Sequence, residues 1–149
     1  MQFERFVKII AVGKMKEKHL AALTDDFLIR LRKYGKCEVV ILPDSDVARE
    51  GEAICRELDK ERNSTIFILS EEGREWTTAQ FSRQLETLDR RAVFVIGGPF
   101  GLSDSVKQRA DQLWSLSKLT FTHEMARFLL CEQLYRALNY LNGGGYHHE

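Results

Sequence analysis

A short apolar stretch followed by closely spaced glycines is the part of this sequence best suited to holding a ligand. Residues 92–96 are β-branched, aromatic or small, which is typical of a central parallel strand covered on both faces. Gly97, Gly98, Pro99 and Gly101 follow, and we expect Gly97 and Gly98 to use positive φ angles and to let a ligand approach the backbone. Because open α/β sheets bind ligands at the carboxyl ends of their strands, this stretch predicts the floor of a ligand site. A tight strand-to-helix connection without a ligand is the alternative.

Alternating strand and helix patterns position this turn. Apolar runs predict five strands, at residues 6–12, 37–42, 65–69, 92–96 and 112–116. Apolar residues spaced three and four apart predict helices at residues 20–34, 47–61, 78–88, 103–110 and 123–141. This alternation predicts an α/β fold, a parallel sheet with helices on both faces, in a single domain spanning residues 1–149.

Several local features are also predicted. Thr77 and Gln80 have the spacing of a capping box, and Ser103 is expected to cap the short fourth helix. Residues 70–74 are expected to form a polar loop. The buried stripes are expected to include Leu23 in the first helix and, in the last helix, Met125, Phe128, Leu129, Leu134, Leu138 and Leu141.

Composition narrows the classes of function. The chain has 149 residues, 44% of them hydrophobic and 30% charged, and a formal net charge of zero, which argues against a general nucleic-acid binder with a basic surface. Basic residues gather before residue 37, so a local basic face for binding nucleic acid remains an alternative. No apolar run is long enough to span a membrane and the charged start is unlike a signal peptide, so we expect a cytoplasmic protein without membrane contact. Three widely spaced cysteines predict neither a disulfide framework nor a metal site.

Five motifs, in order along nearly the whole chain, carry a resemblance to a known family. They are Ile-Ala-Val-Gly-Lys-Met-Lys at residues 10–16, Ile-Gly-Gly-Pro-Phe-Gly at 96–101, Trp-Ser-Leu-Ser-Lys-Leu-Thr at 114–120, Arg-Phe-Leu-Leu-Cys-Glu-Gln-Leu-Tyr-Arg-Ala at 127–137, and Tyr-His-His-Glu at 146–149. In these motifs the chain resembles the RlmH family, small SPOUT-type methyltransferases that modify 23S ribosomal RNA.

The resemblance implies an α/β knot, in which the carboxyl-terminal segment passes through a loop to form a deep trefoil knot, and a homodimer with sites at its interface. It also implies that S-adenosylmethionine binds in the knot, at the end of the third strand, the glycine turn and the loop after the fifth strand. By position, the implied cofactor-binding residues are Leu69, Gly97, Leu116, Ser117, Lys118, Leu119, Thr120 and Phe121. The Lys118 side chain is expected to point away, because it would repel the sulfonium cation.

The reaction implied by the resemblance is methyl transfer to N3 of a pseudouridine in helix 69 of 23S ribosomal RNA, within the large subunit or assembled ribosome. This reaction requires the nucleophile and the methyl group to be positioned in line, and the imide proton of N3 to be removed. Glu132 and Arg136, four apart on one helix face, are candidates to hold the base and a phosphate. Tyr146 and His147 follow three glycines, and His147 is the candidate to orient or deprotonate the base. An exposed ion pair and a frayed terminus are the alternatives.

Two departures from the family pattern stand near these motifs. Residues 121–124 are Phe-Thr-His-Glu where family members commonly have Leu-Pro-His-Pro, so a rigid turn is lost and an acid gained. His148 stands where others often carry arginine. Two other classes of function remain open, a non-catalytic nucleotide-binding module and a ribosome-docking protein of the same fold, and titration with S-adenosylmethionine would separate both from the enzyme.

Overall fold

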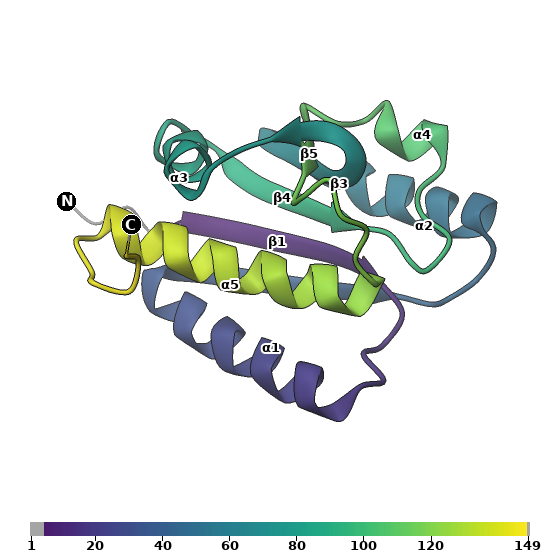
Figure 1. Cartoon of the computed structure of the whole chain (residues 1–149). Coiled ribbons are helices and arrows are strands. Elements are labelled where there is room, and N and C mark those ends of the chain that lie inside the picture. Colours follow the sequence, from purple (N-terminus) through teal and green to yellow (C-terminus); the bar gives the residue numbers. More distant parts are fainter. Residues whose placement is uncertain (1–4, 149) are drawn as a thin grey trace.

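The computed structural model describes residues 5–148 as a parallel sheet between two layers of helices (Figure 1). The strands are β1 (Arg5–Val12), β2 (Gly35–Leu42), β3 (Ser64–Glu75), β4 (Arg91–Ile96) and β5 (Gln112–Ser115). They lie in the order β2-β1-β4-β3-β5, and every neighbouring pair is parallel. The predicted α/β class with a parallel sheet is confirmed.

Within residues 5–148, five α-helices connect and cover these strands. They are α1 (Lys18–Leu31), which continues into a short 3-10 turn (Arg32–Tyr34), α2 (Val47–Asp59), α3 (Thr78–Glu86), α4 (Asp104–Lys107) and α5 (His123–Leu141). Helices α1, α3 and α5 cover one face of the sheet, and α2 and α4 cover the other (Figure 1). The predicted capping box of Thr77 and Gln80 and the Ser103 cap are both present.

The central strands supply side chains to both layers. In β4, Phe94 belongs to the core beneath α1, α3 and α5, whereas Val93 and Val95 belong to the core beneath α2 and α4. Successive side chains of a strand point to opposite faces, so a strand covered on both faces must be apolar throughout. Each side chain buried in this way stabilises the fold by about 1.5–3 kcal/mol. These two cores hold the carboxyl ends of the strands at one edge of the sheet.

The buried face of α1 differs from the prediction. Leu23 is 48% exposed, and Thr24 is buried in its place. The Thr24 hydroxyl donates a hydrogen bond of 2.7 Å to the carbonyl of Leu20, so the polar side chain is satisfied within its own helix and can be buried. In α5, Leu134 and Leu138 are buried as predicted, whereas Met125, Phe128, Leu129 and Leu141 are only half-buried.

The predicted polar loop at residues 70–74 is instead an irregular continuation of β3. Leu69 and Arg74 both pair with Trp114, so the residues between them bulge out of the ladder. A Cβ atom on Gly73 would lie 2.5 Å from the backbone of Leu113, and glycine therefore allows β3 to pass this close to β5. The bulge places Ser70, Glu71 and Glu72 at the edge of the cavity described next.

Candidate functional site

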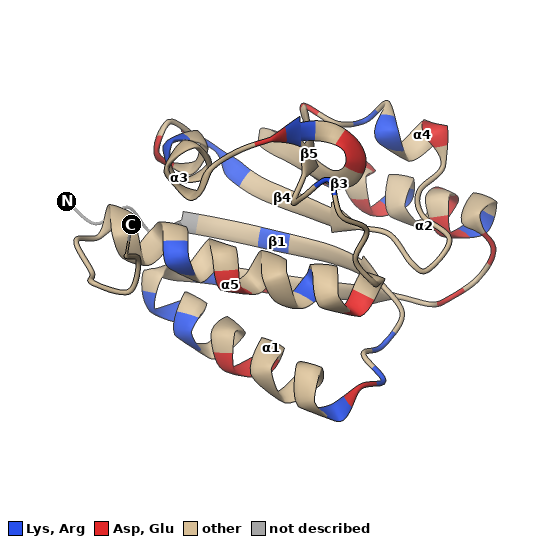
Figure 2. Cartoon of the chain, in the orientation of Figure 1, with Lys and Arg blue, Asp and Glu red and all other residues tan. Residues whose placement is uncertain are grey.

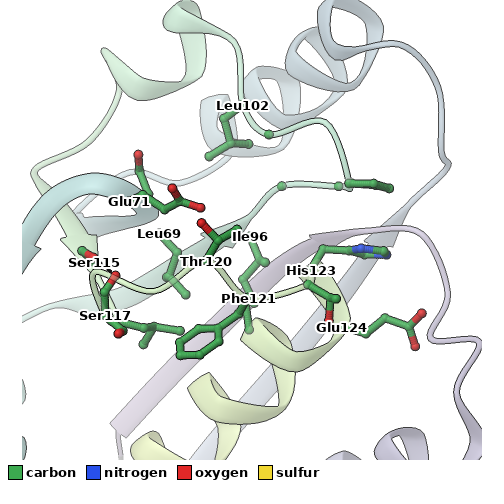
Figure 3. Close-up of a pocket in the computed structure, with 18 of the residues that line it drawn as sticks. Leu69, Glu71, Ile96, Leu102, Ser115, Ser117, Thr120, Phe121, His123 and Glu124 are labelled. Atoms are coloured by element: carbon green, nitrogen blue, oxygen red, sulfur yellow. Dashed lines mark hydrogen bonds between the residues drawn. The ribbon is translucent and has the colours of Figure 1, made fainter.

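A cavity of about 1000 Å³ opens at the carboxyl ends of β3, β4 and β5 (Figure 3). In that view Leu102 and Phe121 lie on opposite sides of the cavity, with Leu69 and Ile96 between them. The first turns of α1 and α5 complete the wall. The position agrees with the ligand site expected for an open α/β sheet, and the volume suits a ligand of cofactor size.

Seven of the eight residues implied for cofactor binding line this cavity. They are Leu69, Gly97, Leu116, Ser117, Leu119, Thr120 and Phe121. Lys118 is exposed and is not part of the lining, in keeping with the expected outward direction of its side chain. The structure thus brings together three segments that are far apart in the sequence.

The loop after β5 is held in shape by its own serines. The Ser115 hydroxyl, which is buried, donates to the carbonyl of Ser117 at 2.8 Å. The Ser117 hydroxyl accepts a hydrogen bond of 3.0 Å from the amide of Leu119. These short-range bonds make the loop a preformed wall, so a ligand would not have to order it.

The glycine turn is shaped by close packing more than by unusual backbone angles. The expected positive φ at Gly97 and Gly98 is wrong, because in this turn only Gly101 has one, at 82°. The amide of Gly101 donates to the carbonyl of Gly98 at 3.1 Å, which closes the turn. A Cβ on Gly97 would lie 2.7 Å from the side chain of Leu102 and 3.0 Å from the carbonyl oxygen of Gly101. Gly97 is therefore required for space.

Acidic side chains dominate the charged part of the lining, a feature that the sequence reasoning missed. Among the described residues, Glu17, Glu71, Glu72 and Glu124 line the cavity together with one lysine, Lys107, whose Nζ lies 3.1 Å from Oε1 of Glu72. Figure 2 shows these acids at the starts of α1 and α5 and in the bulge of β3. Such a lining repels phosphate groups and favours a cationic ligand. Their separation in the chain, over more than one hundred positions, gave no sequence signal for the grouping.

The acid gained at residue 124 joins the starts of two helices. One oxygen of Glu124 accepts hydrogen bonds from the amides of Glu17 at 3.0 Å and Lys16 at 2.8 Å. The hydrogen bond from the Glu17 amide is the main cause that holds the pKa of Glu124 below its usual value, and the bond from the Lys16 amide acts in the same direction. Glu17 in turn accepts from the amide of Leu20 and caps α1. Glu124 thus anchors the wall of the cavity where a rigid turn is missing.

A buried arginine, also missed from sequence, supports the same end of the sheet. The Nη2 atom of Arg127 donates to the carbonyls of Val12 at 2.9 Å and Gly13 at 2.7 Å. Arg127 is 5% exposed, and desolvation lowers the pKa of its guanidinium. Because Val12 ends β1, this side chain fixes the exit of β1 against the first turns of α5.

The four candidates for work on the substrate base form a second, separate cluster. The guanidinium Nε of Arg136 donates to Glu132 at 2.9 Å, and its Nη1 lies 3.1 Å from Nδ1 of His147. The Tyr146 hydroxyl donates to Glu132 at 3.3 Å, and the Arg136 guanidinium lies 4.7 Å from the centre of the Tyr146 ring. Burial, followed by the charge of Glu132, raises the pKa of Tyr146. We call Glu132, Arg136, Tyr146 and His147 the tail cluster.

The tail is folded back onto its own chain. The amide of Tyr146 donates to the side chain of Asn139 at 3.1 Å, and the Tyr146 ring packs 4.9 Å from that of Tyr135. Tyr146 and His147 are therefore held by contacts with α5, which differs from the alternative of a frayed terminus. Glu149, the last residue of the tail motif, lies outside the described residues.

The cavity lies at the start of α5, whereas the tail cluster extends from the middle of α5 to the tail that follows its end (Figure 1). His123 lines the cavity, whereas Arg136 stands thirteen positions further along the helix. At about 1.5 Å per residue, the two are about 20 Å apart along the helix axis. No member of the tail cluster is among the residues that line the cavity. One chain thus assembles both groups and keeps them apart.

Two features are absent from residues 5–148. Within that range no group of three or more His, Cys, Asp or Glu residues is arranged to hold a metal ion. None of the helices described there is both long and apolar enough to cross a membrane.

The comparisons with known proteins agree with this geometry. A family model described as "Predicted SPOUT methyltransferase" matches residues 6–147. Ribosomal RNA large subunit methyltransferase H of Bacteroides thetaiotaomicron is 36% identical over 155 residues, which covers 95% of this chain and 98% of that protein. Its namesake in Christiangramia forsetii is 38% identical over 157 residues, with the same coverage of each chain.

A solved structure shares the fold at low sequence identity. The SpoU methyltransferase AviRb from Streptomyces viridochromogenes, in complex with the cofactor AdoMet, superposes with a TM-score of 0.53 at 12% identity, covering 96% of this chain and 60% of that one. This likeness concerns the fold, whereas the family model and the curated relatives extend over nearly the full length of the sequence. The chain therefore belongs to the SPOUT methyltransferase family and, within it, to the ribosomal RNA large subunit methyltransferase H proteins.

Proposed function

We propose that this protein transfers a methyl group from S-adenosylmethionine to N3 of a pseudouridine in helix 69 of 23S ribosomal RNA. The observation that carries the proposal is the acidic, cofactor-sized cavity, which gathers Leu69, Gly97 and the loop after β5 at one edge of the sheet. Family membership supports action on ribosomal RNA.

The lining fits the proposed cofactor better than it fits a phosphorylated nucleotide. Adenine needs apolar walls, which Leu69, Leu116 and Phe121 supply, and Gly97 brings backbone atoms to the cavity surface, where a ribose could contact them. The bound cofactor would supply an electrophilic methyl group on a sulfonium cation, and the glutamates of the lining favour that charge. Lys107 is paired with Glu72, so the described lining offers a phosphate little attraction. This argues against the nucleotide-binding module as the alternative.

The tail cluster would hold the pseudouridine. A guanidinium only donates hydrogen bonds, so Nδ1 of His147 accepts from Arg136, and a neutral His147 then carries its proton on Nε2. In that tautomer His147 orients a carbonyl oxygen of the base, which favours orientation over the deprotonating role. Glu132 accepts from both Arg136 and Tyr146 and thereby fixes their side chains.

A homodimer would bring the two groups together. Since no member of the tail cluster lines the cavity of its own chain, and Arg136 lies about 20 Å beyond His123 along the helix axis, the proposal places the tail of one protomer over the cavity of its partner. A twofold arrangement makes two such composite sites per dimer. A deep trefoil knot around the cavity, formed by the single domain of residues 1–149, belongs to the same proposal.

Recognition of the substrate would rest mainly on shape. The net charge of zero supplies little sequence-independent affinity for RNA. The dimer would instead fit a preassembled surface of the large subunit or ribosome in the cytoplasm, with Lys14, Lys16, Lys18 and Arg136 meeting phosphates. Free 23S RNA should then be a poor substrate.

Two measurements test the proposal. Calorimetric titration should show binding of S-adenosylmethionine and much weaker binding of ATP, because ATP has the same adenosine but carries phosphates. Ribosomes and large subunits purified from a strain without the modification should then accept a methyl group at the pseudouridine. No binding of S-adenosylmethionine, or methylation of another position only, would contradict the proposal.

A further inference from the structure

A buried carboxylate with an unpaired oxygen lies behind the glycine turn. Glu50, in the first turn of α2, is 3% exposed. Its Oε2 accepts a hydrogen bond of 2.8 Å from the amide of Ser45, whereas the buried Oε1 has no hydrogen-bond partner among the described residues. A buried polar atom without a partner costs free energy, so its presence calls for a reason.

Glu50 touches the turn that lines the cavity. A Cβ on Gly98 would lie 3.2 Å from Oε1 and 3.5 Å from Oε2 of Glu50. Gly98 belongs to the cavity wall and Glu50 does not, so the carboxylate contacts the turn from the side away from the cavity. The next residue, Gly51, packs against Ser103, since a Cβ there would lie 2.5 Å from its Oγ. The start of α2 therefore supports both ends of the segment from Gly97 to Ser103.

We propose that Glu50 is a positioning residue for the cofactor: when S-adenosylmethionine binds, its unpaired Oε1 accepts a backbone N–H of the Gly97–Gly101 turn. This inference rests on the proposed function, because it requires the cofactor to bind against that turn. The carboxylate oxygen that lacks a partner in the free protein gains one in the complex. The free protein is thereby less stable and the complex tighter than with a side chain that cannot accept there.

The substitution Glu50→Gln separates these two effects. The amide keeps the shape of the side chain, and its oxygen can still accept from the Ser45 amide. Its NH2 group, which then faces Gly98, cannot accept a hydrogen bond. We expect the free variant to be as stable as the original protein or more so, because an unpaired buried carboxylate is removed. Affinity for S-adenosylmethionine should fall roughly tenfold, the usual effect of losing one hydrogen bond to a charged group.

A loss of cofactor affinity without a loss of stability distinguishes a positioning role of Glu50 from a structural one. If Glu50 served only the packing of α2, the Gln substitution would lower stability and affinity together, or would leave affinity unchanged. The matched control is Glu52→Gln, an exposed glutamate on the same helix, which should change neither quantity.

The experiment measures thermal unfolding of the free proteins and calorimetric titration with S-adenosylmethionine for the original chain and both variants. Hydrogen exchange of the turn amides adds a direct readout, and the cofactor should protect one of them in the original protein but not in Glu50→Gln. Unchanged affinity, or a parallel loss of stability and affinity, would overturn the role of Glu50. If the original protein did not bind S-adenosylmethionine, the proposed function itself would fail, which the titration of that protein alone reveals.

Discussion

The start of α5 and its second half with the tail carry two chemically distinct regions of this molecule. At its start lies a cavity built from backbone, apolar side chains and exposed acids, with contributions from three strand ends and two helices. Near its end lies the tail cluster, four polar side chains linked directly to one another. The first region suits a cation with an apolar body, and the second suits the polar edge of a base.

The difference between these regions shows how a small chain can form a cavity and a polar cluster in separate places. A cavity requires many elements to converge, and only the carboxyl edge of the sheet offers such convergence. The tail cluster needs only one helix face and a segment that folds back over it, so it can form elsewhere. We expect the two regions to act independently within a chain and jointly between chains.

The largest effect is expected from displacing the glycine turn in the cavity wall. Gly97→Val should abolish detectable binding of S-adenosylmethionine, a loss of more than about 100-fold, because even a Cβ there meets Leu102 at 2.7 Å. The tail cluster should be unaffected. Calorimetric titration checks the binding, and circular dichroism checks that the variant is folded. The control is Gly145→Ala, where an added Cβ meets nothing within 4 Å. Normal titration in a folded Gly97→Val protein would count against the site.

Removal of the tail should leave cofactor binding nearly unchanged and stop methyl transfer. A chain ending at Gly145 should bind S-adenosylmethionine within about twofold of the original protein and lose most methyl transfer to ribosomes, because the lost groups act on the substrate base. Loss of the Tyr146 ring contacts should also lower stability by about 1–3 kcal/mol, so assays belong well below the unfolding temperature.

A milder variant serves as the control for truncation. His147→Ala removes one member of the cluster and keeps the Tyr146 ring in place. It should therefore lower methyl transfer with little change in stability. Full activity of the truncated chain would return the catalytic role to Glu132 and Arg136 alone.

Mixing the two defective chains tests the shared site directly. If the tail of one protomer serves the cavity of its partner, a mixed dimer of Gly97→Val and the truncated chain has one complete site. At equal amounts, half of the dimers are mixed, so activity should recover to about a quarter of the original. Each chain alone should stay inactive. Absence of recovery despite exchange of protomers, or a monomer in light scattering at micromolar concentration, would refute the arrangement.

The smallest effect concerns the anchor at the cavity end. Because the pKa of Glu124 is lowered in the folded protein, its contribution to stability is present above the ordinary glutamate pKa and is lost as the pH falls through the folded value. Glu124→Gln should therefore lower the unfolding free energy at pH 7 by less than about 1 kcal/mol, since the carboxylate is close to solvent. The difference in unfolding free energy between the original protein and Glu124→Gln should disappear at low pH. Thermal unfolding between pH 7 and pH 3 measures it, with the exposed Glu86→Gln as control.

Local patterns in the sequence predicted most of the elements. The apolar runs marked all five strands, and α5 has the predicted bounds, from His123 to Leu141. The capping box of Thr77 and Gln80 was predictable because its hydrogen bonds join residues three apart. Five of the seven predicted residues that line the cavity lie in motifs that are each contiguous in the chain, namely Gly97, Leu116, Ser117, Leu119 and Thr120.

The misses have a common physical cause, since each depends on how the folded chain packs in space and not on a run of residue types. The extension of β3 past Leu69 needs the backbone of β5 beside Gly73. The tight space at Gly97 is set by Leu102 and Gly101, and the burial of Thr24 depends on the covering of its helix face by the core.

By itself the sequence determined the alternation of strands and helices, the glycine turn and the family, because periodicity and motifs are properties of neighbouring residues. Tertiary structure alone decided three other matters: the acidic lining of the cavity, the unpaired oxygen of Glu50 behind Gly98, and the distance between the cavity and the tail cluster. Charges and buried oxygens acquire their energies from whatever lies within a few ångströms of them, and in this chain those neighbours come from segments that only the folded sheet brings together.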